Sequence, residues 1–228
     1  MLSYVRVDDA EKEQKKCYRS NLYGPTILAE ACSNYDVKFL SFSTDLVFDG
    51  QKPYTEMDAV APLNNYGKSK AEAEKEISIL NSKALIVRTS SLFWPWDQFN
   101  FAFTTLKSLK EHQGVRAASD VFVSSTYVPD LVNECLDLLL DNESGIFHIT
   151  NFNALSWSEF AVKIAVMAGH DASLIEPVNI ANMKLKATRP SYSVLKSKKG
   201  IIMPSIDNAL YRFFENIDPI YLSNRIAG

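Results

Sequence analysis

Short apolar runs alternate along the chain with longer stretches in which apolar residues recur at the spacing of one helix face. Three runs have the length and the β-branched or aromatic content of buried strands, at 37–43, 84–89 and 146–150. Helical spacing predicts helices over 8–34, 65–80, 99–110, 129–140, 156–168 and 206–214. Because strands that alternate with helices are typical of parallel sheets, the pattern predicts an α/β fold with a partial Rossmann-like parallel sheet flanked by helices.

The first helix carries its own boundary signals. Asp8 followed three residues later by Glu11 matches a capping box, which predicts that the helix begins there. Gly24 and Pro25 fall inside the same helical pattern. Because proline removes a backbone donor and crowds the preceding turn, we expect an interruption or a kink at this point.

Length and composition predict the domain organisation. A chain of 228 residues with 46% hydrophobic content can bury a substantial core. We assign residues 1–150 to a partial NAD(P)-binding domain and 151–228 mainly to a smaller C-terminal substrate-binding lobe, with segments that can interleave.

Charged residues make up 22% of the chain and the formal net charge is −3, so a nucleic-acid partner is not expected. The densest basic cluster (Lys196, Lys198, Lys199) is interpreted as a solvated loop rather than a phosphate site.

Cysteine usage and hydropathy predict the setting. The three cysteines, Cys17, Cys32 and Cys135, have no metal-ligand spacing and suit buried packing positions, so no metal site is expected. We find no secretory signal and no apolar run long enough to span a bilayer. These features predict a cytoplasmic protein without a membrane partner.

Tyr66 and Lys70 are the first candidates for chemistry. Four residues apart on a helix, they share one face, where the Lys70 ammonium is expected to lower the pKa of Tyr66. Spacing alone is weak evidence, since Tyr192 and Lys196 repeat it. Tyr66 and Lys70, however, fall on the inward stripe with Ala73, Ile77 and Leu80, whereas Glu72, Lys75 and Glu76 fall outside it. The alternative is an aromatic ring at a helix start with a lysine whose stem lies along apolar surface.

Thr44 favours the chemical interpretation. It stands where an apolar strand ends, and ligands in open α/β sheets bind beyond the carboxyl ends of strands. A hydroxyl there could hydrogen-bond a substrate carbonyl together with Tyr66. The competing interpretation is a threonine that bonds only to its own turn.

One long block and several shorter segments resemble the dTDP-4-dehydrorhamnose reductase family, a branch of the extended short-chain dehydrogenases/reductases. The block runs from Ser43-Thr44-Asp45 to Tyr66-Gly67-Lys68-Ser69-Lys70 and is highly specific. Looser matches extend the resemblance over most of the chain: Tyr4-Val5-Arg6-Val7-Asp8, Arg88-Thr89-Ser90, Asn100-Phe101, and Arg189-Pro190 with Ser193 and Leu195.

The resemblance implies a function and a set of site residues. It implies hydride transfer from NADPH or NADH to the 4-keto carbon of a nucleotide-linked deoxysugar. The resemblance further implies that Tyr66 donates the proton, Thr44 polarises the carbonyl and Lys70 holds the cofactor ribose. Ser43 is expected beside the cofactor. The expected substrate-binding residues are Thr44, Asp45, Ser91, Asn100 and Arg189.

The sequence departs from the family at several positions. Leu46 stands where an aromatic residue is usual and Ser91 where a tryptophan or similar residue is frequent, which bears on the sugar that is recognised. The stretch 120–126 lacks the usual glycine and proline. The aromatic stretch 93–97 is interpreted as packing beneath the lobe, with stacking on a sugar or base as the alternative.

No Gly-rich phosphate-binding turn is present among the eight glycines, although a dinucleotide fold opens with one. Either the sequence is a fragment or the protein never had this cradle. We therefore expect an uncovered sheet edge and weak or absent dinucleotide binding by the chain alone, which a calorimetric titration with NADPH would measure. The remaining expected partner is a second copy in a homodimer or an N-terminal part of the same protein.

Two other functions stay open at this point. The chain also resembles non-catalytic members of the same fold, such as the regulatory subunit of methionine adenosyltransferase, but a scaffold need not keep Thr44, Tyr66 and Lys70 together. An epimerase or dehydratase is ranked third. Those relatives usually place acid/base groups beside the threonine, where this chain has Asp45 and Leu46.

Overall fold

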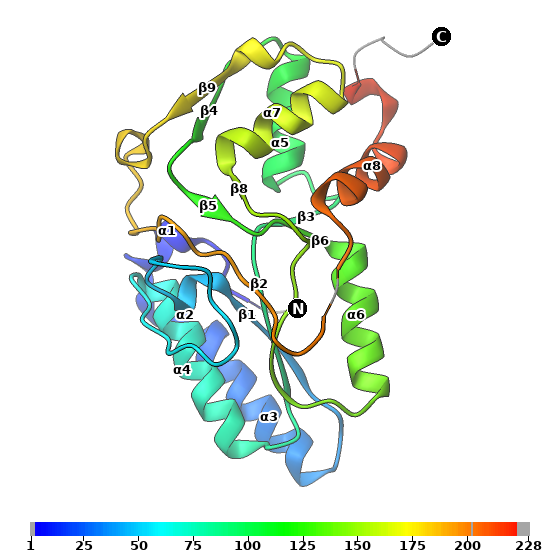
Figure 1. Cartoon of the computed structure of the whole chain (residues 1–228). Helices are drawn as coiled ribbons and strands as arrows, with labels where there is room; N and C mark the ends of the chain where they lie inside the picture. Colours follow the sequence, from blue (N-terminus) through cyan, green and yellow to red (C-terminus); the bar gives the residue numbers. More distant parts are fainter. Residues whose placement is uncertain (1–2, 202, 223–228) are drawn as a thin grey trace. The chain divides into compact units, whose positions relative to one another are not determined.

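A computed structural model describes residues 3–201 and 203–222 (Figure 1). The helices are α1 (Val7–Ala10), α2 (Gln14–Tyr18), α3 (Gly24–Asn34), α4 (Asn65–Leu80), α5 (Phe101–Lys110), α6 (Val128–Leu140), α7 (Trp157–Met167) and α8 (Ile206–Asn216). The strands are β1 (Leu40–Thr44), β2 (Leu85–Thr89), β3 (Leu92–Phe93), β4 (Val115–Ala118), β5 (Phe122–Val123), β6 (Thr126–Tyr127), β7 (Gly145–His148), β8 (Leu155–Ser156) and β9 (Ile175–Val178).

The chain divides into two compact units, each built from three segments. Unit 1 comprises residues 1–89, 132–149 and 185–201, and unit 2 comprises 90–131, 150–184 and 202–228. The units therefore interleave along the sequence. The functional assignment of 1–150 and 151–228 to two domains stays a prediction.

Unit 1 is built on a parallel sheet in the order β1-β2-β7. Helices α3 and α4 pack on it through a cluster that includes Ala29, Ala73, Ile77 and Ile86. Ala73 and Ile77 lie on the apolar stripe that the periodicity predicted for α4. The stripe expected for the first helix is wrong in its second half, since Leu28 is exposed and Ala29 is buried instead. Among the described strands β1 forms one edge of the sheet, as expected. The α/β class and the parallel sheet are confirmed.

The first helical region differs from its predicted start. Helix α1 begins at Val7 after Arg6, and Asp8 lies inside it, so the predicted capping box is wrong. The Asp8 carboxylate instead accepts hydrogen bonds from the backbone of Lys186 and Ala187, far away in the sequence. The interruption is confirmed: a π-helical segment, Arg19–Tyr23, separates α2 from α3, and Pro25 stands in the first turn of α3, where its missing N–H breaks no helical hydrogen bond.

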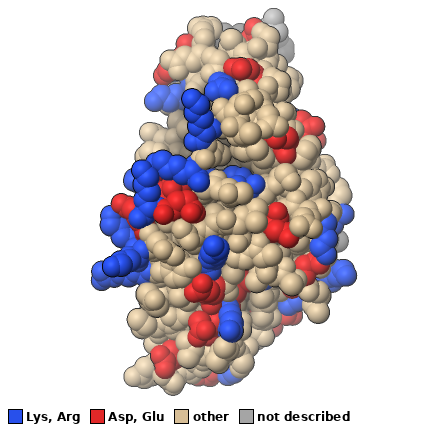
Figure 2. Space-filling model, turned by 90° about the vertical axis from the view of Figure 1, so that its left-hand side faces the viewer, with Lys and Arg blue, Asp and Glu red and all other residues tan. Residues whose placement is uncertain are grey.

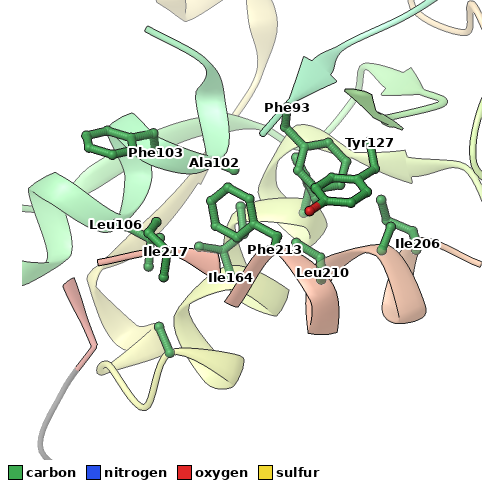
Figure 3. Close-up of a cluster of buried hydrophobic side chains, with 13 residues drawn as sticks. Phe93, Ala102, Phe103, Leu106, Tyr127, Ile164, Ile206, Leu210, Phe213 and Ile217 are labelled. Carbon is green, nitrogen blue, oxygen red and sulfur yellow. The ribbon is translucent and has the colours of Figure 1, made fainter. Parts of the chain in front are cut away.

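Unit 2 has an aromatic core, drawn in Figure 3. Phe93 from β3 lies against Tyr127 from β6, with ring centroids 5.4 Å apart, and against Phe213 from α8 at 5.8 Å. Unit 2 also contains three small sheets: parallel β3-β6, which contributes Phe93 and Tyr127 to this core, parallel β4-β9 and antiparallel β5-β8. Most of these strands have two residues, which is too short to give a periodic signal.

The surface carries mixed charge. Figure 2 shows basic and acidic side chains interspersed on one face. Lys196, Lys198 and Lys199 are exposed, as a solvated loop requires, and the choice against a phosphate site stays a prediction. Cys17 and Cys135 are buried as predicted, whereas Cys32 is partly exposed. In the part of the chain that the structure describes, no helix has the length and apolarity needed to cross a membrane.

Candidate active site

Thr44 ends strand β1 and begins the next turn. Its hydroxyl accepts a hydrogen bond from the backbone of Leu46 (3.2 Å) and donates one to the carboxylate of Asp45 (3.1 Å). The side chain thereby caps a short 3₁₀ helix, Asp45–Val47. Both interpretations of Thr44 are compatible with this geometry, because the hydroxyl bonds to its own turn and also lies at the carboxyl end of the strand.

Helix α4 brings Tyr66 to this turn. Asn64 caps the helix by accepting a hydrogen bond from the Gly67 backbone (2.8 Å), and Glu11 accepts one from the Asn65 backbone (2.9 Å). A β-carbon on Gly67 would lie 2.1 Å from the carbonyl oxygen of Leu46. Glycine is therefore required for the helix start to approach the Thr44 turn closely.

The Tyr66 hydroxyl lies close enough to Thr44 for that side chain to affect its acidity. Desolvation raises the pKa of Tyr66, and the negative charge of Asp45 raises it further, while the hydrogen bond with Thr44 acts in the opposite direction. The predicted lowering of this pKa by Lys70 is wrong in sign, because burial dominates. Tyr66 is consequently held in its protonated form at neutral pH.

Lys70 is buried one turn after Tyr66. Its ammonium donates a hydrogen bond to the backbone carbonyl of Phe42 in β1 (2.9 Å). Burial lowers the pKa of Lys70 to about 8, against the opposing charge of Glu74. An ammonium with this pKa is still mostly protonated at pH 7. The sequence prediction that Lys70 lies on the inward face is confirmed.

A buried ion pair next to these residues was not predicted. Glu74 of α4 binds Arg88 of β2, with 2.6 Å between Oε2 and Nη2, and both side chains are almost fully buried. Glu74 also accepts a hydrogen bond from Ser43. The sequence did indicate that Glu74 faces inward, since it stands four residues after Lys70 and hence on the same helix face. Ser43, expected beside the cofactor, directs its hydroxyl to this carboxylate.

The other predicted residues of unit 1 make internal contacts. Asp45 is buried and accepts a hydrogen bond from Ser193 as well as from Thr44. Arg189 forms an ion pair with Asp8 (2.7 Å) and donates to the carbonyl of Ala187 (2.8 Å). Its guanidinium thus holds the segment around Ala187 against α1. A role of either residue in substrate binding stays a prediction.

Two predicted residues belong to unit 2. Ser91 has a left-handed backbone (φ 47°), a conformation that is uncommon for residues other than glycine and concentrates at functional sites. Asn100 caps α5 through Phe103 (2.9 Å) and donates to the carbonyls of Trp94 (2.8 Å) and Asp97 (2.7 Å). Asn100 therefore shapes the aromatic loop that precedes it.

The aromatic stretch 93–97 is only partly packed. Phe93 is buried in the core of unit 2, which fits the packing interpretation. Trp96 is 70% exposed and Phe99, just beyond the stretch, is 93% exposed. The packing interpretation is therefore wrong for Trp96.

Comparison with known proteins places these features in a family. Residues 2–214 match the family described as the RmlD substrate binding domain. The chain is 34% identical to the spore coat polysaccharide biosynthesis protein SpsK of Bacillus subtilis (strain 168), over 86% of the chain and 69% of that protein. It is 33% identical to a dTDP-4-dehydrorhamnose reductase of Aggregatibacter actinomycetemcomitans, over 86% of the chain and 71% of that protein.

A solved structure agrees with the sequence matches. The dTDP-4-dehydrorhamnose reductase of Bacillus anthracis str. Ames, crystallised in complex with NADP, superposes with a TM-score of 0.89 and is 34% identical. The match covers 93% of the chain and 78% of that protein. The chain thus belongs to the RmlD substrate-binding domain family.

Proposed function

We propose that the chain carries the proton-donating part of an NADPH- or NADH-dependent reductase that acts on the 4-keto group of a nucleotide-linked deoxysugar. The observation that carries this proposal is the approach of Tyr66 to Thr44 at the carboxyl end of β1, with Lys70 on the next turn of α4. Relatives named dTDP-4-dehydrorhamnose reductase, one of them crystallised with NADP, support the substrate and cofactor classes.

The residues suit the proton-transfer half of a carbonyl reduction. A bound nicotinamide cofactor would supply the hydride to the keto carbon. Tyr66 then gives its proton to the carbonyl oxygen, and the product is an alcohol. Because the pKa of Tyr66 is raised, the proton is in place before reaction and leaves only as negative charge develops on the oxygen. The Thr44 hydroxyl, whose hydrogen is directed to Asp45 in this structure, would turn it to the same oxygen when substrate binds.

Lys70 fits the ribose of the cofactor. Its ammonium has three donor hydrogens, and the structure assigns one of them to Phe42, which leaves donors for ribose hydroxyls. The described residues offer no Gly-rich turn for the pyrophosphate, so dinucleotide binding by this chain is expected to be weak. We further propose a cytoplasmic setting, where nucleotide-linked sugars and reduced cofactors are available.

The test is oxidation of NADPH by the full 228-residue chain in the presence of dTDP-4-keto-6-deoxysugars, with millimolar cofactor to offset weak binding. Tyr66→Phe should lower turnover by a factor of about 10² or more, the usual contribution of a positioned acid. Tyr192→Phe, in the other tyrosine–lysine pair, is the matched control and should keep its rate. A Tyr66→Phe protein with full turnover would refute the proposal, and a chain that binds NADPH but never oxidises it favours the scaffold alternative.

A further inference from the structure

A row of polar side chains crosses the sheet of unit 1 one position before the catalytic end of β1. Ser43 pairs in register with Arg88, and Arg88 pairs with His148, so the three residues occupy neighbouring strands on one face of the sheet. All three are buried. Helix α4 packs on this face and adds Glu74 to the row.

Glu74 uses both carboxylate oxygens in this row. Oε1 accepts hydrogen bonds from Ser43 and from Nε of Arg88 (2.9 Å), and Oε2 accepts one from Nη2 of Arg88 (2.6 Å). The guanidinium is fixed further by the Phe48 ring, whose centroid lies 5.0 Å away. Because replacing a buried ion pair by apolar residues is often neutral or stabilising, net stability alone does not account for this arrangement.

The contacts between β1 and α4 indicate a role for the Ser43–Glu74–Arg88 row. Three consecutive residues of β1 each contact one residue of α4. The Phe42 carbonyl accepts a hydrogen bond from Lys70, and Ser43 donates one to Glu74. Thr44 interacts with Tyr66. The outer two contacts are those of the proposed reductase site. The middle contact is the one that is also anchored to β2, through Arg88.

We propose that Glu74 is a positioning residue, whose carboxylate, shared between Ser43 and Arg88, holds the Lys70 turn of α4 in register with the end of β1. This inference rests on the proposed function. Glu74 touches neither substrate nor cofactor in this scheme; it acts through Lys70 and Thr44.

Electrostatics provide a readout that a merely structural residue would not move. The charged group that acts on Lys70 is Glu74 of its own helix, since burial raises the pKa of the Cys17 thiol of α2 and keeps it neutral in this range. The Phe42 carbonyl of β1 accepts a hydrogen bond from the Lys70 ammonium. Removing the charge of Glu74 also leaves Arg88 uncompensated. Both changes disfavour the Lys70 ammonium, so the pKa of Lys70 should fall below about 8 in Glu74→Gln.

The experiment measures this pKa directly in the full chain labelled with ¹³Cε-lysine, using Lys70→Arg to assign the Lys70 resonance. We expect a fall of about half a unit or more in Glu74→Gln, as for a charge one helical turn away. Glu74→Asp keeps the charge but shortens the reach, and we expect the Lys70 resonance to shift and broaden there as well. Glu76→Gln, an equal charge change on the exposed side of α4, is the control and should leave the resonance in place.

Ser43→Ala covers the case in which Glu74→Gln fails to fold, because it removes one hydrogen bond and leaves the ion pair intact. A displaced Lys70 resonance in Ser43→Ala supports the proposal, and an unmoved one overturns it. A folded Glu74→Gln protein with an unchanged Lys70 titration overturns it equally. None of these readouts needs turnover, so failure of the reductase assay and failure of this inference can be told apart. In an active protein, the alkaline limb of the rate profile should move to lower pH in Glu74→Gln.

Discussion

His148 makes the stability of unit 1 depend on pH. Its Nε2 lies 3.3 Å from Nη1 of Arg88, and its Nδ1 lies 3.1 Å from the carbonyl oxygen of Lys196. A guanidinium can only donate and a carbonyl can only accept, so the neutral tautomer with hydrogen on Nδ1 satisfies both contacts. Protonation of Nε2 would bring two donors together. Burial, and then the charge of Arg88, lower the pKa of His148 to about 4.

The linkage between proton binding and folding gives the sign and size of the change in stability that His148 causes. The folded pKa is about 4 and the reference value is 6.5, so between these limits the unfolded chain binds more protons than the folded chain. Stability is therefore fully present above pH 6.5 and is lost as the pH falls toward 4. Between pH 7.5 and pH 5 the expected loss is about 2 kcal/mol, and it levels off near about 3 kcal/mol below pH 4.

Urea unfolding followed by circular dichroism at several pH values measures this loss. His148→Gln removes the titration while keeping an amide oxygen that can accept from Arg88, so its stability should vary with pH by about 2 kcal/mol less over the same interval. His112→Gln, at an exposed position, should behave like the parent chain. All three tryptophans, Trp94, Trp96 and Trp157, lie in unit 2, so fluorescence reports that unit separately. Equal pH dependence in His148→Gln and the parent would refute the reasoning.

Two further predictions concern packing. Gly67→Ala should destabilise the chain by about 1–3 kcal/mol or more, because the new methyl would overlap the Leu46 carbonyl. Thermal unfolding measures this loss. Gly114→Ala is the control and should change the stability little, because its methyl would meet only ordinary contacts. Phe213→Ala should cost unit 2 about 3–5 kcal/mol through the cavity left among Phe93 and its neighbours, measured by tryptophan fluorescence in urea. Truncation of the exposed Tyr211 on the same helix should have a much smaller effect, and equal losses in the two variants would contradict the packing argument.

The sequence predicted the elements whose periodicity is long and regular. Helix α4 begins and ends where its stripe predicted, because apolar positions that recur every three to four residues over sixteen residues leave little ambiguity. Strand β2 was predicted within one residue by a different signal, a short continuous apolar run. Thr44, Tyr66 and Lys70 could be chosen because strand end and helix face are local properties.

What could not be predicted depends on contacts between distant residues. Asp8 was read as a helix cap because its partner Arg189 lies 181 positions away. The pKa of Tyr66 was expected to be lowered, because the spacing to Lys70 is visible in the sequence, whereas the burial of Tyr66 and the charge of Asp45, which raise this pKa, are not. Glu74 resembled its exposed neighbours on α4 until Arg88 was placed opposite it.

The interleaving of the two units constrains how the chain can fold. Unit 1 is completed only by residues 185–201, which supply Ser193 to Asp45 and Arg189 to Asp8. During synthesis the end of β1 therefore emerges long before the residues that secure it. Contacts so distant in sequence close late and slow folding, because the entropy of ordering the intervening chain comes first. The turn that carries Thr44 is accordingly expected to be among the last parts of unit 1 to become rigid.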